Sequence, residues 1–478
     1  MLESKNWIGG EWTTPGGSAV PVYSPSNLQE QMGVLHLSNP ADMRQAGAAA
    51  RQALPRWADT HLPVRGEVLF KMANLLEQQV EDVALVASLE MGKPISEMKG
   101  EVLRGVNLLR YYAAEGVRAI GAVIPHSQDK VLQYTRRIPL GVVGVITPWN
   151  FPVAIPVWKI APALICGNTV VWKPAEIASL TATRLVQVFA QAGLPGGVLN
   201  LVVGKGAAIG NTLLDEVQLD AVSFTGSTGT GMHVAAACAQ RNIKYQTEMG
   251  GKNAAVVLGD ADLAVAVPAV LSGAFRSAGQ KCTATSRVIV ERSIYDAFSV
   301  AMREEMGRMH IGSALDPQSY LGPVASADQH EKVLNYVKLA QAADKVAEGQ
   351  PQVDPSSGHY VMPLVVTGVD VESPLVQEEI FGPVATLLPA NDFDEAVALC
   401  NRTVYGLSAA VFTRDLQKGF RFLDQAEAGM VRVNQETAGV EYQAPFGGMK
   451  NSSSHSREQG QAALDFYSQM KTCAVYYG

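Results

Sequence analysis

The feature that most constrains the fold of this chain is a regular alternation of strand-like and helix-like segments between Gly141 and Asn253. Four short apolar runs bounded by turn residues have the composition of buried strands: GVVGVITP, GNTVVWKP, GVLNLVVG and DAVSFTGS. Helical stretches separate them, among them VAIPVWKIAPALI, LTATRLVQVFAQAG and GTGMHVAAACAQ. This alternation predicts a parallel sheet covered by helices on both faces. Ligands of such sheets bind beyond the carboxyl ends of the strands.

The regions on either side extend the α/β pattern. An opening hairpin-like segment, WIGGEWTTPGG, is followed by apolar residues at helical spacing over residues 41–116. After about Asn253 a second series of strand-like runs begins, with AAVVLG, SRVIVE, PVATLLP, AAVFTR and GMVRVN. A chain of 478 residues is long enough for two or three domains. We predict one domain from residues 1–117 and 138–250, a second from 251–450, and a small β element from 118–137 and 451–478.

The C-terminal segment, FYSQMKTCAVYYG, ends in an apolar run of strand-forming residues. Left alone, such a run would be an exposed sheet edge, so we expect it to pair with another element. We interpret it as an oligomerisation strand and expect a homodimer or a homotetramer.

Composition excludes several classes of protein. The net charge of −7 argues against nucleic-acid binding, which normally needs a basic face. The odd number of scattered cysteines, with no CxxC pair, is wrong for a disulfide framework or a structural zinc site, and no metal is expected. The first residues lack the pattern of a secretory signal, and no apolar run reaches the roughly 20 residues of a membrane span. A cytoplasmic protein without a membrane or nucleic-acid partner is therefore expected.

Two glycine-rich turns follow strands and could receive a phosphate. Gly204, Gly206 and Gly210 are spaced as GxGxxxG, which departs from the dinucleotide fingerprint, and an ordinary turn explains them as well. FTGSTGTG, residues 224–231, ends a strand and opens a helix, so its backbone N–H groups could face an anion. It is not a Walker loop, because no GK[ST] follows.

Several polar residues stand in loops where chemistry would be expected. Cys282 in SAGQKCTATSR is flanked by small polar residues, which favours a reachable thiol over the inert core cysteine that is more common. Glu248 in TEMGGKN is either a solvated charge or, beside a nucleophilic cysteine, a general base. Asn150 in TPWNFP is either a turn residue or a donor to an oxyanion. Lys173 and Glu176 in VVWKPAE follow a strand and by themselves could be solvated loop residues.

Taken together and in order, seven motifs closely resemble those of the aldehyde dehydrogenase superfamily: PWNFP, WKPAE, FTGSTGTG, EMGGKN, GQKCTATSR, EEIFGPV and PFGGMKNS. They run from Trp149 to Asn451, and the flanking regions also fit. The resemblance implies an α/β, aldehyde dehydrogenase-like fold with a Rossmann-type NAD(P)-binding domain, an α/β catalytic domain and a small β oligomerisation element. The first predicted domain would bind NAD(P), and residues 251–450 would be catalytic.

The resemblance also implies residue roles. Cys282 would be the nucleophile, Glu248 the general base and Asn150 the oxyanion donor. Lys173 and Glu176 would contact the adenosine ribose, the 226–231 turn would lie near the pyrophosphate, and Glu379 and Phe381 would hold the nicotinamide half. The cofactor-binding residues implied are Thr147, Pro148, Trp149, Lys173, Glu176, Gly226, Ser227, Gly231, Glu379 and Phe381.

The reaction so implied oxidises an aldehyde to an acid through a thiohemiacetal and a thioester on Cys282. Family members that pass the acyl group to coenzyme A generally lack a glutamate at the position of Glu248, so its presence favours hydrolysis. A carboxylate at Glu176 would bond the free 2′-hydroxyl of NAD and repel the 2′-phosphate of NADP. NAD is therefore expected, with NADP as the alternative because lysines in the loop could compensate.

Three segments look most like those of 2,5-dioxopentanoate (α-ketoglutaric semialdehyde) dehydrogenases: ITPWNFPVAIPVWKIAPAL, AFRSAGQKCTATSR and APFGGMKNSSSHSREQG. That aldehyde carries a carboxylate and needs a cation. Arg104 is expected to face the substrate, although a surface helix arginine is an equal alternative, and Lys281 and Arg276 are further candidates. Phe151 is expected beside the substrate.

Residues 153–158 lack the basic residue that some enzymes of this specificity carry. Succinic semialdehyde, betaine aldehyde or a broad range of aldehydes therefore stay open as substrates. A cofactor-independent thiol esterase is the alternative from another class of enzyme.

Overall fold

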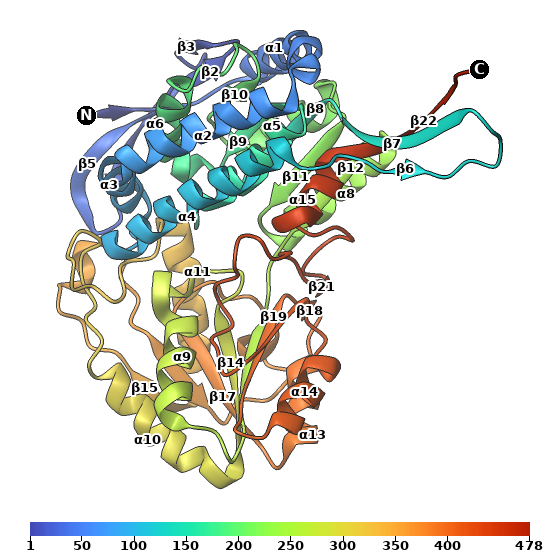
Figure 1. The fold of residues 1–478 in the computed structure, drawn as a ribbon. Coiled ribbons are helices and arrows are strands. Elements are labelled where there is room, and N and C mark those ends of the chain that lie inside the picture. The colour runs from blue at the N-terminus through green and yellow to red at the C-terminus, as the bar shows by residue number, and fades with distance from the viewer.

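Two seven-stranded sheets organise the molecule, one in each of its two bodies (Figure 1). The computed structural model describes residues 1–478. The first sheet has the order β12-β11-β8-β9-β10-β2-β3 and the second β15-β16-β17-β14-β13-β19-β20. The first comprises β2 (Asn6–Ile8), β3 (Glu11–Thr13), β8 (Val142–Thr147), β9 (Thr169–Pro174), β10 (Leu199–Leu201), β11 (Ala221–Thr225) and β12 (Lys244–Glu248). The second comprises β13 (Asn253–Val257), β14 (Thr285–Glu291), β15 (Asp344–Glu348), β16 (Leu364–Thr367), β17 (Val384–Ala390), β19 (Ser408–Phe412) and β20 (Met430–Val433).

Helices cover both faces of the first sheet, as the alternation of segments predicts. Successive side chains of a strand point to opposite faces, so Val143 of β8 belongs to one core with residues of α2, α4 and α5, whereas Val142 belongs to another with residues of α1 and α8. The helices of this body include α1 (Pro40–Asp59), α2 (Leu62–Gln78), α3 (Val80–Met91), α4 (Ile95–Ala114), α5 (Ala154–Ile165), α6 (Ser179–Ala190), α7 (Gly206–Asn211) and α8 (Thr228–Gln240). The five strands from β8 to β12 pair in parallel, and β2 runs antiparallel to β10.

The second sheet is built in the same way. Ala255 and Val257 of β13 share a core with α9 (Leu263–Phe275) and α10 (Tyr295–Met306), whereas Ala254 and Val256 face α13 (Phe393–Asn401) and α14 (Leu416–Gln425). All its neighbouring strands are parallel except β15, which runs antiparallel to β16. The predicted α/β class, with two such bodies, is confirmed.

The edge of the first sheet that faces the second sheet is formed by the carboxyl ends of its strands, whereas the facing edge of the second sheet is formed by the amino ends. The loops that bear Asn150, Ser227 and Glu248 lie at the carboxyl ends of β8, β11 and β12. Cys282 and Phe381, in contrast, come just before the amino ends of β14 and β17. The carboxyl edge of the first sheet thus meets the amino edge of the second, and the residues predicted from the motifs gather where they meet.

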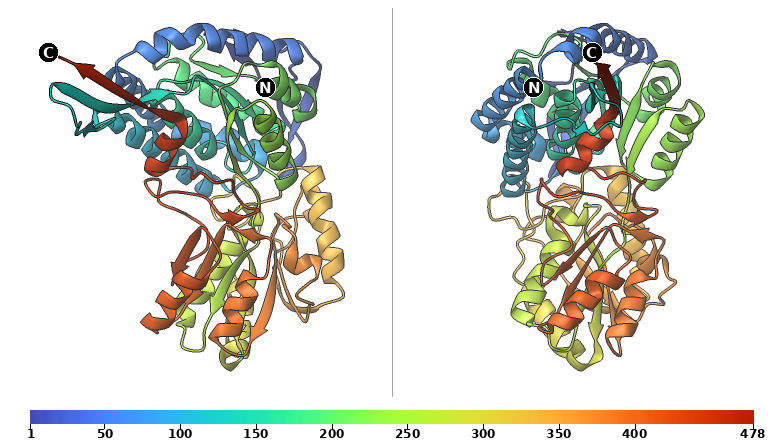
Figure 2. Two further views of the ribbon diagram at one scale, coloured as in Figure 1. Left: turned by 90° about the vertical axis from the view of Figure 1, so that its right-hand side faces the viewer. Right: turned by 45° about the vertical axis from the view of Figure 1, so that its right-hand side comes forward.

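A third, three-stranded sheet projects from the first body as an arm (Figure 2). It contains β6 (Val123–Ile124), β7 (Val131–Pro139) and the C-terminal strand β22 (Ser468–Tyr476), in the order β22-β7-β6. The tail pairs antiparallel with β7 of the same chain along its whole length, which satisfies one of its two edges. No helix of the structure combines the length and apolar character needed to span a bilayer.

Candidate active site

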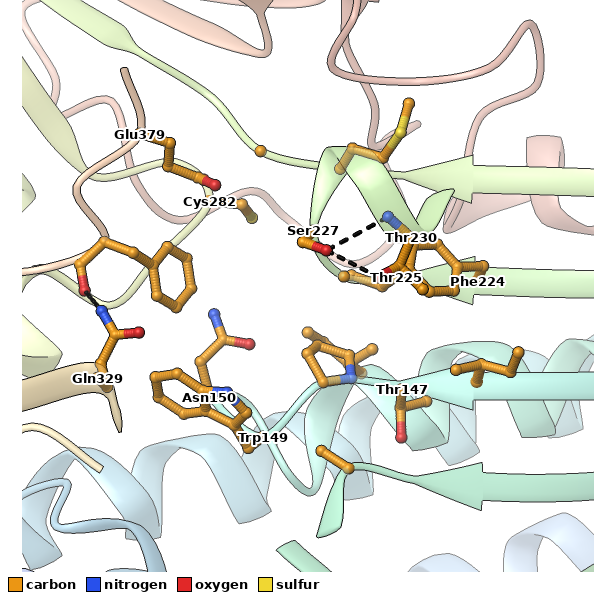
Figure 3. A pocket seen from close by; sticks show the side chains of 18 of the residues that line it. Thr147, Trp149, Asn150, Phe224, Thr225, Ser227, Thr230, Cys282, Gln329 and Glu379 are labelled. Atoms are coloured by element: carbon orange, nitrogen blue, oxygen red, sulfur yellow. Dashed lines mark hydrogen bonds between the residues drawn. The ribbon is translucent and has the colours of Figure 1, made fainter. Parts of the chain in front are cut away.

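A cavity of about 350 Å³ lies between the facing edges of the two sheets (Figure 3). The predicted residues that line it are Thr147, Pro148, Trp149, Asn150, Lys173, Gly226, Ser227, Cys282, Glu379 and Phe381. Segments 234 residues apart in the sequence, from Thr147 to Phe381, thereby line one cavity. The motifs therefore identify one continuous site rather than several separate loops.

Cys282 lies in the loop between the short helix η4 (Arg276–Gly279) and β14, and its side chain is half-buried. Its carbonyl accepts a hydrogen bond from the Asn253 amide at 2.8 Å. Burial, together with the nearby carboxylates of Glu379 and Glu248, raises the pKa of the Cys282 thiol to about 12. The thiol is therefore protonated at neutral pH, and its proton must be removed before the sulfur can act as a nucleophile.

Asn150 extends from the opposite wall of the cavity toward Cys282 (Figure 3). It is buried, and its Nδ2 donates to the carbonyl of Gln280 at 2.9 Å. Because an amide nitrogen carries two N–H groups, one donor remains for another acceptor. The Oδ1 atom has no hydrogen-bond partner. The side chain is thus fixed in place with donor capacity to spare, which is what oxyanion stabilisation requires.

Glu248, the last residue of β12, is buried just behind the cavity wall. Its Oε2 accepts a 2.5 Å hydrogen bond from the Ser453 hydroxyl, and its Oε1 has no partner. Burial and the neighbouring Glu458 raise the pKa of Glu248 well above its ordinary value. A raised pKa makes the Glu248 carboxylate a stronger base, which suits a group that accepts a proton from a thiol or a water.

A buried ion pair lies behind Glu248. Lys159 of α5 is bonded to Glu458, which also accepts from the Trp158 indole at 2.7 Å. None of the sequence motifs contains this pair. A signal was present, because Lys159 is the only charged residue of an otherwise apolar helix. Ser453 gave no such signal, since one serine of a serine-rich loop cannot be singled out from sequence.

The turn after β11 forms one end of the cavity. Ser227 caps α8: its Oγ accepts from the Thr230 backbone N–H at 3.4 Å and donates to the Thr230 hydroxyl at 2.9 Å (Figure 3). A side chain at Gly226 would come within 2.6 Å of the Phe224 ring, so only glycine fits this turn. The start of α8, with its unbonded N–H groups and positive helix dipole, therefore opens into the cavity. Gly231 lies one turn further, packed against Met249 behind the wall.

Lys173 lies on the same side of the cavity and is buried. Its ammonium donates to the Pro174 carbonyl at 3.0 Å and to no other protein group. Burial lowers the pKa of Lys173 to about 8, so the ammonium form predominates at neutral pH. Two of its three N–H groups are free for a ligand.

The other end of the cavity is formed by Glu379 and Phe381. Glu379 accepts from the Gly251 backbone N–H at 3.1 Å, and burial raises its pKa. Phe381 has the left-handed φ of +58° and meets the Trp149 ring edge-on at 5.5 Å. Gln329 of α11 (Ala327–Ala340) donates to the Phe381 carbonyl at 2.7 Å (Figure 3).

Gln329 and Lys332 line the cavity although no motif marked them. They stand on one face of an otherwise ordinary polar helix, so the sequence gave no signal for either.

Some predicted residues lie outside this cavity. Glu176 begins the short helix η2 (Glu176–Ala178), is one-third exposed, and has Lys205 as its nearest cation, at 3.9 Å. Phe151 is covered on one face by the Lys93 ammonium, 3.8 Å from the ring centre. Neither residue contacts the free space beside Cys282.

The three candidate cations for a substrate carboxylate differ in their surroundings. Arg104 donates to the Val440 carbonyl and, at 3.1 Å, to Gln459, and it forms no ion pair. Lys281 is buried and donates to the Ser272 carbonyl at 3.1 Å. Arg276 is exposed and lies over the Tyr320 ring. None of the three lines the cavity, and Arg104 is the half-buried member of the set.

Comparison with known proteins supports the predicted resemblance. The model of the aldehyde dehydrogenase family matches residues 12–473. An alpha-ketoglutaric semialdehyde dehydrogenase of Bacillus subtilis is 46% identical, over 98% of this chain and 97% of that protein. A 2,5-dioxopentanoate dehydrogenase of Saccharolobus solfataricus is 37% identical over the full length of both chains.

Solved structures show the same fold. An NAD-dependent aldehyde dehydrogenase from Sinorhizobium meliloti matches with a TM-score of 0.96 and 34% identity, over 100% of this chain and 95% of that one. A betaine aldehyde dehydrogenase from Staphylococcus aureus, solved in complex with NAD⁺, matches with a TM-score of 0.95 and 32% identity, over 99% and 95% of the two chains.

Proposed function

This chain belongs to the aldehyde dehydrogenase family, and from that premise we propose that it uses NAD to oxidise 2,5-dioxopentanoate to 2-oxoglutarate through a thioester on Cys282. The observation that carries the proposal is the single cavity in which the Cys282 thiol faces the Asn150 amide. The rest of the wall supplies groups suited to a dinucleotide.

The residues present fit NAD. Buried polar atoms without a partner gather at this edge of the first sheet, namely Asn150 Oδ1, Thr225 Oγ1 and Thr228 Oγ1, and such atoms are ordinarily satisfied by a ligand or water. We assign the start of α8 to the pyrophosphate and Lys173 to a ribose, with Glu379 and Phe381 at the nicotinamide half. When bound, NAD supplies the acceptor for the hydride that leaves the aldehyde carbon. The NAD complex of the Staphylococcus aureus relative supports this choice.

NAD rather than NADP is proposed because of Glu176, whose carboxylate would repel a 2′-phosphate. Lys205, 3.9 Å away, offsets part of that charge and keeps NADP as the alternative.

The chemistry on the protein side follows from the site. The Cys282 sulfur attacks the aldehyde carbon, and its proton passes to a base; Glu248, with its raised pKa and unpartnered Oε1, fits that role. The oxyanion that forms accepts the remaining N–H of Asn150, an interaction worth about 3–4 kcal/mol in comparable sites. After loss of hydride, a thioester remains on Cys282. Glu248 then activates the water that hydrolyses it.

The substrate proposal rests on the relatives named for this aldehyde and on Arg104. The Arg104 guanidinium is half-buried, donates only to neutral oxygens and forms no ion pair, so its charge is compensated only in part, by the nearby carboxylates of Glu441 and Glu101. A substrate carboxylate at the far end of a five-carbon chain would compensate it.

The test is NADH formation at 340 nm with 2,5-dioxopentanoate, succinic semialdehyde, betaine aldehyde, propanal and benzaldehyde, each with NAD and with NADP. We expect 2,5-dioxopentanoate with NAD to lead by about tenfold or more in kcat/KM. Equal rates with the neutral aldehydes would instead identify a broad-range enzyme. Ester cleavage without any NADH formation would favour the thiol esterase alternative.

We also propose that the arm joins subunits into a homodimer or a homotetramer. Its strands leave large apolar side chains exposed, including Val123, Leu132, Met470, Val475 and Tyr476. Exposed apolar strands on a sheet edge favour association. Light scattering of the whole chain, compared with a Leu132→Lys, Val475→Lys variant, tests this, and a monomeric wild type would refute it.

All five cysteines are free thiols, which fits a reducing compartment such as the cytoplasm.

A further inference from the structure

The first turns of α4 carry two carboxylates, Glu97 and Glu101, that do not line the cavity. Residues four apart on a helix lie on one face, so both point to the same side of α4. Each one is bonded to a different loop of the proposed reaction centre. Helix α4 therefore contacts both the loop that bears Asn150 and the turn that leads to Cys282.

Glu101 reaches the Asn150 loop by two routes. Its Oε1 accepts from the backbone N–H groups of Val153 and Ala154, at 2.9 and 3.0 Å, and so caps the start of α5, which has no cap of its own. Its Oε2 accepts from the Lys93 ammonium at 2.7 Å, and that ammonium also donates to the Asn150 carbonyl at 2.6 Å. The Lys93 and Glu101 side chains are only 1% and 2% exposed. The pair thus holds the backbone on both sides of Phe151.

Glu97 holds the other loop. Its Oε1 accepts from the Ser277 backbone N–H at 3.1 Å, and its Oε2 accepts from the Ser277 hydroxyl at 2.7 Å. Ser277, Ala278 and Gly279 all have left-handed φ angles, of 57°, 53° and 68°. Two successive non-glycine residues in this region are strained and persist only where surrounding contacts hold them. The Glu97 carboxylate supplies two such contacts at the first of the three.

The two loops and the helix close a ring of hydrogen bonds. Asn150 Nδ2 donates to the Gln280 carbonyl at 2.9 Å, and Gln280 Nε2 donates to the Ser277 carbonyl at 3.1 Å. Glycine at position 105 lets α4 approach α5 closely, because a side chain there would come within 3.3 Å of Val153. The helix between Glu97 and Glu101 is a rigid spacer, about 6 Å long, since each residue rises 1.5 Å.

We propose that Glu97 and the Lys93–Glu101 pair are positioning residues, and that α4 sets the placement of Asn150 relative to Cys282. The inference rests on the proposed function, because placement matters only if these two residues carry the chemistry. A buried ion pair is seldom kept for stability alone, since apolar residues of similar size often serve as well. Here both partners end on backbone groups that flank the oxyanion donor, which gives the pair a geometric role.

The first experiment measures turnover of Lys93→Met and Glu101→Gln with saturating aldehyde and NAD. We expect kcat to fall about 10- to 100-fold, because displacements of about 1 Å have effects of this size. The KM for NAD should change little, since neither Lys93 nor Glu101 lines the cavity assigned to the cofactor. Glu77→Gln is the matched control: it breaks the exposed 2.6 Å pair with Arg110 at the far end of α4 and should leave kcat unchanged. Unchanged kcat in both Lys93 and Glu101 variants would overturn the proposal.

A double-mutant cycle separates positioning from general damage to the fold. In an Asn150→Ala background, Lys93→Met should cost less than about twofold in kcat, because the group that it positions is gone. A merely structural role would give the same loss in both backgrounds and would overturn the proposal. Glu97→Gln should still lower kcat in the Asn150→Ala background, because it acts through the turn before Cys282.

Two readouts do not depend on turnover. Hydrogen exchange should accelerate over residues 147–156 in Lys93→Met and over 276–284 in Glu97→Gln, with the rest of the chain unchanged. Ser277→Ala removes only the hydroxyl donor and should reproduce the second effect more weakly, should Glu97→Gln fail to fold. Failure of the proposed function would appear as full turnover in Cys282→Ala. Failure of this inference would appear as unchanged hydrogen exchange and unchanged kcat in the Lys93, Glu97 and Glu101 variants while Cys282→Ala is inactive.

Discussion

The carboxyl edges of the two sheets are built alike, but they differ in whether the polar groups of their loops have hydrogen-bond partners within the protein. At the first sheet, Asn150, Thr225, Thr228 and Glu248 each keep a buried polar atom without a partner. At the second, the loops that follow the strands hold one such atom, Oε2 of Glu436 after β20. Asp260 there accepts from the Thr413 hydroxyl and from two backbone N–H groups of the same loop.

The difference shows that an α/β sheet edge is not by itself a binding site. Loops after the strands of the second sheet use their carboxylates internally: Asp392 caps α13 and Asp415 caps α14. The second sheet contributes to the cavity from its other edge, where Cys282 precedes a strand. The carboxyl edge of the first sheet can bind a ligand because its loops keep donors and acceptors that no other protein group uses.

The largest loss of activity is expected when the thiol of the second sheet is replaced. Cys282→Ala removes the only nucleophile that the second sheet supplies, and we expect dehydrogenase turnover to fall at least about 10⁴-fold. NAD binding, measured by calorimetry or fluorescence, should stay near wild type because the first edge is intact. Residual turnover within tenfold of wild type would refute the role of Cys282.

The next largest effect is expected at Glu248. In Glu248→Gln, steady-state turnover should fall about 10²- to 10⁴-fold because water activation is lost. A rapid burst of NADH should remain in stopped-flow traces if hydride transfer precedes the step that Glu248 assists. Loss of the burst would show instead that Glu248 is needed earlier, to deprotonate Cys282.

A smaller change is expected at Glu176, on the first edge but outside the cavity. Glu176→Ala should raise the kcat/KM ratio of NADP to NAD by about tenfold, since one charge repulsion of about 1 kcal/mol or more is removed. Lys205→Ala is the control and should lower the kcat/KM ratio of NADP to NAD. An unchanged ratio in both variants would exclude this pair from cofactor choice.

The smallest effect should come from the second edge. Asp260→Asn should leave kcat/KM unchanged and lower Tm by about 1 °C, as expected for a loss near 1 kcal/mol in a chain of 478 residues. Burial tends to raise the pKa of Asp260, but hydrogen bonds from Thr413 and Arg414 outweigh it and lower the pKa. The ionised carboxylate therefore stabilises the fold above pH 4, and this contribution is lost as the pH falls through the lowered pKa. The Tm difference between the variant and wild type should accordingly shrink below about pH 4; reduced kcat/KM would show that the second edge does bind ligand.

Much of the first sheet could be predicted because its strands are buried on both faces. Runs such as VVW in β9 are apolar and are soon followed by turn residues, so the order of strand, loop and helix can be predicted. The loops that line the cavity could be placed for the same reason, since Asn150 lies in the loop after β8 and Glu248 is the last residue of β12. Local pattern did not reveal where the helical stretch over residues 41–116 divides, for example at Gln79 between α2 and α3.

Contacts between distant segments could not be predicted. Ser453 reaches Glu248 across 205 residues, and Lys93 reaches Asn150 across 57. Each contact depends on how helices and loops stack after the sheets form, which no short motif encodes. The placement of Arg104 beside Val440, 336 residues away, is of the same kind.

The C-terminal segment has a consequence for how the protein is made. Phe466 and Tyr467 are buried in the core of the first body, and the Tyr467 carbonyl accepts from Asn168 at 2.8 Å. Strand β22 then pairs with β7, more than 300 residues earlier in the chain. During synthesis, part of the core of the first body therefore stays uncovered until residues 466–476 have left the ribosome. Chaperone binding to that exposed surface would be expected in a chain stalled before residue 460.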